Sequence, residues 1–209
     1  MDEDYDIVPA TVGDRDRIAE FLSQTYFKYE PLNMSEARNP NRTTDASRYL
    51  GFLTQNTSLM AITKSGLIIG IAINGENSSE ELNRPLQNPS KIQKFIRVFE
   101  QKANIWQLTG EDRGMFVRIL VVDPIAGGRG IGKALMIQSK ELAKAKGYPL
   151  MAIICSSYYS AKISQSMGME CVYKLPYSEY KDEDGIPIFI PPPPHKEISI
   201  FIEKLNSGN

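Results

Sequence analysis

The stretch VVDPIAGGRGIGKALM, Val121–Met136, joins the end of an apolar run to a segment of helix-forming residues. Four of the six residues from Gly127 to Gly132 are glycines. Backbone N–H groups at a helix start bind anions when no side chain covers them, and the helix dipole adds to the attraction. The stretch therefore predicts either a phosphate-binding loop or a simple turn between a strand and a helix.

Two common nucleotide motifs fit this stretch poorly. The dinucleotide fingerprint needs glycine or alanine three residues after Gly130, where Lys133 stands, and no acidic ribose ligand ends the next strand. A P-loop match from Gly127 to Lys133 is followed by Ala134, which has no hydroxyl for magnesium. The sequence therefore gives only weak support to a dinucleotide site, and we reject a nucleotide triphosphatase.

Composition excludes several other classes. The chain has 209 residues and a formal net charge of −1, which gives no electrostatic reason to expect binding to nucleic acid or a membrane surface. No apolar run approaches the ~18 residues of a membrane span, and MDEDYDIVPA does not resemble a signal peptide. Cys155 and Cys171 lie in apolar surroundings without metal-ligand spacing, so we expect two buried, reduced thiols and no metal. These features predict a cytoplasmic protein.

Hydrophobic periodicity predicts one mixed α/β domain over residues 1–209. The predicted helices are 15–28, 45–56, 91–106, 130–146 and 158–168, and loops are expected at 30–44, 75–90 and 189–196. The predicted strands are 5–10, 58–63, 67–74, 114–122, 149–157, 169–177 and 197–205.

A third phosphate motif, R/Q-x-x-G-x-G/A for coenzyme A, matches better. Gly130, Ile131 and Gly132 supply its G-x-G part, although Gly127 replaces the arginine or glutamine. YFKYEPLN (26–33) and CSSYYSAKISQSMGMECVYKLPYSEY (155–180) closely resemble arthropod arylalkylamine N-acetyltransferases, members of the GCN5-related N-acetyltransferases. The three matches follow the family's order and cover most of the domain.

This resemblance implies a fold. It predicts the GCN5-related acetyltransferase fold of the α/β class: a central mixed, mostly antiparallel sheet with helices on both faces. Two neighbouring middle strands, Phe116–Val122 and Leu150–Cys155, should splay apart so that a thioester can enter between them. A substrate-side insertion is expected at about 75–110, and its helix should help to form the amine pocket.

The resemblance also implies catalytic residues. Acetyl transfer to an amine requires a group that accepts a proton, and Glu30 matches the family's general base. Ser156 and Ser160 match the family serines near the acetyl group. A helix cap by Ser156 or its neighbour Ser157 would explain these serines without catalysis.

Acetyl-CoA is the expected co-substrate, bound mostly by backbone groups. The predicted residues are Leu120, Val121 and Val122 beside the pantetheine arm, and Gly128, Arg129, Gly130, Ile131, Gly132 and Lys133 at the pyrophosphate. We expect Lys162 to be an exposed helix residue and Asp123 to order the turn into Pro124.

Several residues have rival interpretations. Tyr158 and Tyr159 are alternative acids for the leaving thiolate, ranked below the serines. Cys155 is a rival nucleophile, but nothing basic adjoins it in the sequence. His195, the only histidine, follows four prolines and is expected on a surface loop. Four apolar or aromatic residues that are candidates for the amine pocket, Tyr29, Leu32, Phe95 and Tyr177, are more typical of core packing.

The predicted function is acetyl transfer from acetyl-CoA to a small primary amine by direct attack in a sequential mechanism, in a monomer. The preferred acceptor is an arylalkylamine such as dopamine, tyramine or serotonin. The alternatives are agmatine, histamine or a polyamine, a protein acceptor, and a catalytically inactive acyl-CoA-binding protein.

Overall fold

The structure is a computed structural model that describes residues 4–36 and 46–205. Its seven strands form one sheet in the order β1-β2-β3-β4-β5-β7-β6. All neighbours are antiparallel except the β4–β5 pair, as expected for the predicted fold. The strands are β1 (Tyr5–Pro9), β2 (Leu59–Thr63), β3 (Ile68–Ser78), β4 (Arg113–Val122), β5 (Leu150–Cys155), β6 (Glu170–Pro176) and β7 (Glu197–Lys204).

The β4–β5 pairing is short, and the rest of the site depends on it. Only Met115–Val117 of β4 pair with β5, opposite Met151–Ile153. Beyond this ladder, β4 keeps its pairing with β3 as far as Val122, and β5 keeps its pairing with β7 as far as Cys155. The two middle strands therefore separate towards their carboxyl ends, which confirms the expected splay.

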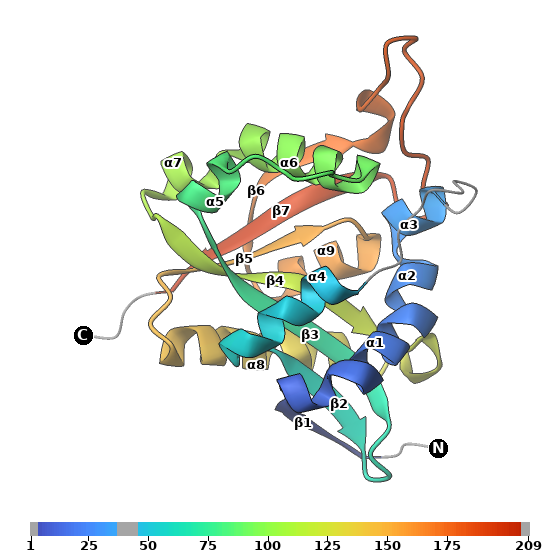
Figure 1. The fold of residues 1–209 in the computed structure, drawn as a ribbon, viewed down its shortest axis with the longest axis vertical. Coiled ribbons are helices and arrows are strands. Elements are labelled where there is room, and N and C mark those ends of the chain that lie inside the picture. Colours follow the sequence, from blue (N-terminus) through green and yellow to red (C-terminus); the bar gives the residue numbers. More distant parts are fainter. Residues whose placement is uncertain (1–3, 37–45, 206–209) are drawn as a thin grey trace.

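Helices cover both faces of the sheet (Figure 1). Figure 1 shows α1, α4 and α6 on the front face, and α8 and α9 lie on the rear. The helices are α1 (Arg15–Gln24), α2 (Tyr26–Tyr29), α3 (Pro31–Ser35), α4 (Ser47–Leu50), α5 (Ser79–Asn83), α6 (Lys91–Ala103), α7 (Ile105–Thr109), α8 (Ile131–Ala145) and α9 (Tyr158–Ser166). Short 3-10 turns are η1 (Val12–Asp14), η2 (Gly51–Gln55), η3 (Pro124–Ala126) and η4 (Tyr177–Glu179).

The predicted helix at 91–106 illustrates how the sequence specifies a covering element. Ser90 and Gln93 form a capping box at the start of α6, and Asn104 ends it with a left-handed φ of 43°. Phe95 and Phe99, one turn apart, are fully buried in a core that also contains residues of β5, β6 and β7. The helix thus covers the sheet half that carries β5.

Two predicted loops contain helices. The 75–90 segment extends β3 to Ser78 and then forms α5, because the Ser78 hydroxyl accepts a hydrogen bond from the Glu81 N–H at 3.2 Å. The 30–44 segment begins with α3, which Pro31 starts at its first position. Residues 37–44 of that predicted loop lie outside the described residues. The predicted 15–28 helix breaks at Thr25 into α1 and α2.

Gly114 permits the close approach of β4 and β5 beside their short ladder. A Cβ atom added there would lie 2.9 Å from the Leu150 carbonyl oxygen. We expect Gly114→Ala to lower the free energy of unfolding by about 1–3 kcal/mol, because the crowded strands must move apart. Gly51→Ala is the control, since its Cβ would meet nothing within 4 Å. Urea unfolding of both variants checks this, and equal stability would contradict it.

Candidate active site

The glycine-rich loop connects β4 to α8 and leaves the start of that helix uncovered. Asp123 accepts a hydrogen bond from the Ile125 N–H at 2.9 Å, which confirms its role in the turn. Gly128 and Gly130 have φ values of 79° and 74°, and a side chain at either would meet nothing within 4 Å. Ala134 makes the first hydrogen bond of α8, to the Gly130 carbonyl at 2.9 Å. The preceding N–H groups are thus free of intrahelical partners and suit an anion.

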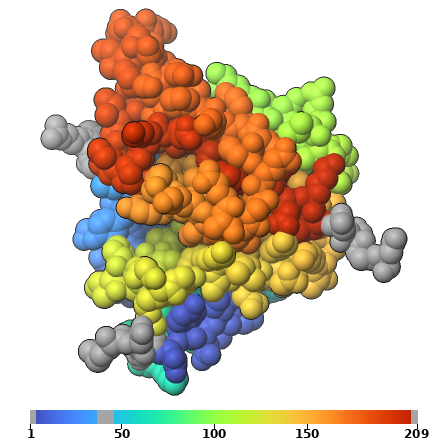
Figure 2. Space-filling model, turned by 180° about the vertical axis from the view of Figure 1, so that it is seen from behind, coloured from blue at the N-terminus to red at the C-terminus, as the bar shows by residue number. Residues whose placement is uncertain are grey.

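A cleft of about 900 Å³ leads from this loop between the separating strands to α2 and α3. The starts of α8 and α9 line it, and these helices lie side by side on the rear face (Figure 2, yellow and orange). Arg129 does not line the cleft; its guanidinium lies 5.6 Å from the centroid of the Tyr5 ring. The other predicted site residues all line it: Glu30, Leu120, Val121, Val122, Gly128, Gly130, Ile131, Gly132, Lys133, Ser156 and Ser160.

Glu30 lies where α2 ends and α3 begins. Its carboxylate caps α3: Oε1 accepts from the Leu32 N–H at 3.1 Å, and Oε2 accepts from the Asn33 N–H at 2.7 Å. The Asn33 side-chain amide donates to Oε2 at 2.8 Å. The Ser156 side chain, which follows β5, lies close enough to the carboxylate to favour its ionised form. Two segments far apart in the sequence therefore meet at this carboxylate.

Burial raises the pKa of Glu30 above the usual value of a glutamate, although the hydrogen bonds to its carboxylate oppose the shift. A raised pKa makes this carboxylate a stronger base than a solvated one. Burial, together with the charge of Glu30, also raises the pKa values of Tyr26 and Tyr177. Both phenols therefore stay protonated beside the carboxylate at neutral pH.

The three serines at the start of α9 have different contacts. Ser157 caps the helix by accepting the Ser160 N–H at 3.0 Å. The Ser160 hydroxyl donates to the Ser157 carbonyl at 3.0 Å. The Ser156 carbonyl accepts from the Tyr177 hydroxyl at 2.7 Å, which holds the serine beside Glu30. Ser157 thus caps α9, and the adjacent Ser156 lies beside the Glu30 carboxylate.

Cys155 is buried at the end of β5, and its Sγ lies 3.6 Å from the Ser164 hydroxyl. Burial raises the pKa of its thiol to about 11. A thiol with this pKa is a poor nucleophile at neutral pH. Cys171 is exposed, so the expectation that both thiols are buried was wrong for this residue.

His195 lines the cleft, which the sequence pattern did not indicate. Its Nδ1 accepts a hydrogen bond from the Tyr158 N–H at 3.1 Å, and its ring meets the Tyr159 ring edge-on at 5.8 Å. Burial lowers the pKa of His195, so the neutral ring is favoured, with its proton on Nε2. The contact spans 37 residues of sequence, so no local pattern could have predicted it.

Of the other residues considered from the sequence, some pack in the core and others line the cleft. Leu32, Phe95 and Tyr177 are buried in one core cluster, as the packing interpretation expected. Tyr29 is exposed and lines the cleft. Lys162 is exposed on α9, as predicted, and also borders the cleft.

Two further features bear on function. Within residues 4–36 and 46–205, no group of three or more His, Cys, Asp and Glu residues is arranged to hold a metal ion. In the same part of the chain, every helix is too short or too polar to cross a membrane.

The chain matches no protein-family model, but it is similar to several solved structures. Arylalkylamine N-acetyltransferase 2 from Aedes aegypti is 30% identical, with a TM-score of 0.87 over 97% of this chain and 100% of that one. A mosquito arylalkylamine N-acetyltransferase-like 5b is 25% identical, with a TM-score of 0.85 over the same shares. A Drosophila melanogaster polyamine N-acetyltransferase that forms N-acetylagmatine is 24% identical, with a TM-score of 0.86 over 97% and 100%.

The two thiols should differ in reactivity. We expect iodoacetamide at pH 7.5 to modify Cys171 in the native protein and to leave Cys155 unmodified, because Cys155 is buried and less than about 10⁻³ of it is thiolate at that pH. Peptide mass mapping before and after unfolding in urea measures this. Equal labelling of both residues in the native state would restore Cys155 as a candidate nucleophile.

Proposed function

Because this chain belongs to the arthropod arylalkylamine N-acetyltransferase family of GCN5-related N-acetyltransferases, and is therefore an acyltransferase, we propose that it transfers acetyl from acetyl-CoA to the primary amine of an arylalkylamine. The observation that carries the proposal is one cleft that holds both the glycine-rich loop and the Glu30–Ser156 pair. A pure acyl-CoA-binding protein would not need a buried carboxylate of raised pKa beside the strand opening.

Acetyl-CoA binds with its pantetheine arm along the free edge of β4, at Leu120, Val121 and Val122. The splay supports this placement, because the N–H and C=O groups of β4 that face β5 beyond Val117 have no ladder partner in β5. The pyrophosphate lies on the backbone N–H groups of Gly128–Gly132 at the start of α8, where Gly128 and Gly130 leave open space. Lys133 and Arg129 add positive charge near the loop.

Glu30 is the general base. Amines such as tyramine are ammonium ions at neutral pH, and a proton must leave before the nitrogen can attack the thioester. Hydrogen bonds from Leu32 and Asn33 hold the carboxylate in a fixed orientation beside Ser156. The amine then attacks the thioester carbonyl directly, because the Cys155 thiol is buried and protonated.

Ser160 and Ser156 assist at the acetyl group. A hydroxyl relays a proton or holds a water molecule, and the leaving thiolate of coenzyme A needs a proton. Tyr159, exposed on the first turn of α9 and lining the cleft, remains the alternative acid. The acceptor enters beside Tyr29, whose ring suits an aromatic or cationic amine. The protein acts as a cytoplasmic monomer in this proposal.

A panel of amines tests the function and the base together. We expect acetyl-CoA-dependent thiol release with arylalkylamines, and a fall of about 10²-fold or more in kcat for Glu30→Gln, as for the loss of a general base. In the wild-type protein kcat should fall as pH drops through the raised pKa of Glu30, because only the ionised carboxylate accepts a proton. The variant should lack this acidic limb.

Glu36→Gln is the matched control for this experiment, because Glu36 is a buried carboxylate at the other end of α3 and does not line the cleft. It should retain both the rate and the acidic limb. Saturable acetyl-CoA binding without turnover of any amine would refute the proposed reaction and favour a protein acceptor or a binding protein.

The coenzyme cradle can be tested with two glycines of similar backbone conformation. Gly130 and Gly66 have φ values of 74° and 86°, and a Cβ at either would meet no atom within 4 Å. Alanine at both positions should cost similar stability, about 1 kcal/mol, because the left-handed conformation is strained. Only Gly130→Ala should raise the KM for acetyl-CoA, by about tenfold, since its methyl group enters the anion site. An unchanged KM would contradict the cradle.

A further inference from the structure

β4 carries one extra residue where it pairs with β3. Val117 and Ile119 pair with consecutive residues of β3, so the register skips Arg118 and forms a β-bulge there. Val117 packs in the rear core and Ile119 packs in the front core. Neighbouring residues of a regular strand point to opposite faces, and a bulge changes this alternation. The bulge directs the Arg118 side chain to the front of the sheet, together with that of Ile119.

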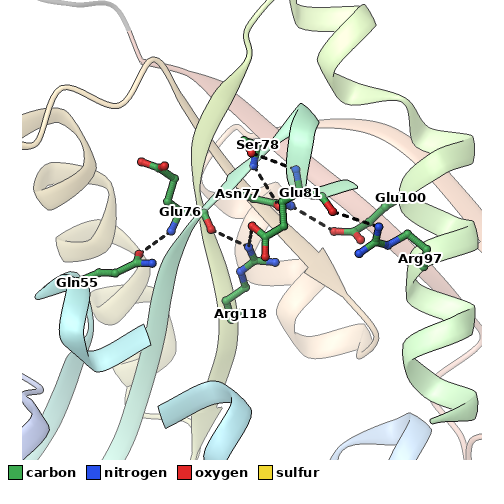
Figure 3. A network of polar contacts seen from close by, with 8 residues as sticks. All are labelled: Gln55, Glu76, Asn77, Ser78, Glu81, Arg97, Glu100 and Arg118. Carbon is green, nitrogen blue, oxygen red and sulfur yellow. Dashed lines mark hydrogen bonds and ion pairs between the residues drawn. The ribbon is translucent and has the colours of Figure 1, made fainter. Parts of the chain in front are cut away.

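On that face the Arg118 guanidinium contacts two aromatic rings, and Figure 3 shows its polar partners. The centroids of Phe52 and Phe116 are 4.9 and 5.1 Å from its central carbon. The Arg118 Nη2 group donates a hydrogen bond to the Glu76 carbonyl oxygen at 2.8 Å and forms an ion pair with the Glu81 carboxylate at 3.8 Å. The side chain is therefore fixed, and it keeps 16% of its surface exposed.

Keeping the buried Arg118 side chain charged lowers the stability of the folded protein. Burial lowers the pKa of Arg118, and its Nε–H is buried without a hydrogen-bond partner among the described residues. The nearby carboxylates compensate the charge only in part: Glu81 is half exposed and solvent-screened, and burial raises the pKa of Glu100. Arg48 adds a further positive charge. An apolar residue would pack against the two rings without this cost, so a positive charge here indicates a role in the cleft.

Arg118 lines the same cleft as Glu30, on the acceptor side. The charge of Glu30 contributes to the raised pKa of Tyr26. The Tyr26 ring contacts the ring of Tyr49, and the two centroids are 5.7 Å apart. Tyr49 in turn lies close enough to Arg118 to raise the pKa of the guanidinium. Arg118 thus lines the cleft from β4, whereas Glu30 lines it from the junction of α2 and α3, so the two charges lie on different walls of the acceptor site.

The charges that line the cleft are few among the described residues. The carboxylates are Glu30 and Asp123, and Asp123 caps the turn at the coenzyme loop. Lys133 and Lys162, on α8 and α9, lie on the coenzyme side. The acceptor side of the described cleft therefore presents one carboxylate, at the base, and one guanidinium, on the β4 wall.

We propose that Arg118 selects acceptors by charge: it admits primary amines whose remaining part is uncharged and rejects those with a second cation at the far end. The inference rests on the proposed function, since Glu30 must receive the reacting amine. A second ammonium or guanidinium at the β4 wall meets the positive charge of Arg118 in a partly desolvated site, where like charges repel more strongly than in water.

Two amines of equal length test this. n-Pentylamine and 1,5-diaminopentane differ only in the far end, and thiol release from acetyl-CoA gives kcat/KM for each. We expect Arg118→Gln to raise the kcat/KM of the diamine relative to the monoamine by about tenfold, because Glu81 and Glu100 are left without this cation. Arg118→Lys should keep the wild-type ratio. Arg97→Gln is the charge-matched control, because Arg97 caps the end of α5 and does not line the cleft.

Salt provides a test that does not depend on a folded variant. Raising the ionic strength should increase the diamine-to-monoamine ratio in the wild-type protein, since it screens the repulsion. A wild-type preference for the diamine, a ratio that Arg118→Gln leaves unchanged, or an equal response to Arg97→Gln would overturn the role of Arg118. Absence of thiol release with every amine would instead overturn the proposed function, so the two failures are distinguishable.

Discussion

The constraint on which the structure depends is the early end of the β4–β5 ladder. Three residue pairs join the two strands, and beyond them each strand keeps only its outer neighbour. Unpaired backbone groups inside a protein require partners, so an opening of this kind persists only where a ligand or water supplies them. Because β4 runs directly into the glycine-rich loop and β5 into the serines before α9, the same opening brings the anion cradle and the Glu30–Ser156 pair into one cleft.

Glu30 combines a structural and a chemical role. As the cap of α3 it accepts two backbone N–H groups, it accepts a third hydrogen bond from the Asn33 side-chain amide, and it lies beside Ser156. Its raised pKa means that the folded protein binds this proton more tightly than the unfolded chain does. The stability from this group is therefore fully present below the ordinary pKa of a glutamate and is lost as pH rises through the folded value. At neutral pH the ionised Glu30 therefore lowers the free energy of unfolding, while it provides a basic carboxylate in the cleft.

Local patterns predicted the elements that follow local rules. The β2–β3 hairpin, α6 and α8 each follow from hydrophobic spacing and terminal signals, and the G-x-G match identified the loop. Glu30, Ser156 and Ser160 came from family resemblance, and the structure brings Glu30 and Ser156 into contact.

The missed features depend on tertiary contacts. α3 and α5 are five residues each, too short for periodicity to register. His195 reaches the cleft through a contact with the start of α9, and a sequence shows no difference between it and a solvated loop histidine. The bulge at Arg118 is equally invisible, because FVRILVV reads as a regular buried strand. The exposure of Cys171 depends on which face of an edge strand remains uncovered.

The strand order has a consequence for how the chain folds as it is made. β7 lies between β5 and β6, so these two strands never pair with each other. β1 to β4 pair in the order of the sequence, whereas β5 and β6 have no shared partner until β7 is available. A nascent chain that ends before Glu197 therefore lacks the strand that covers the edge of the apolar β5 segment LMAIIC and that joins β6 to the sheet.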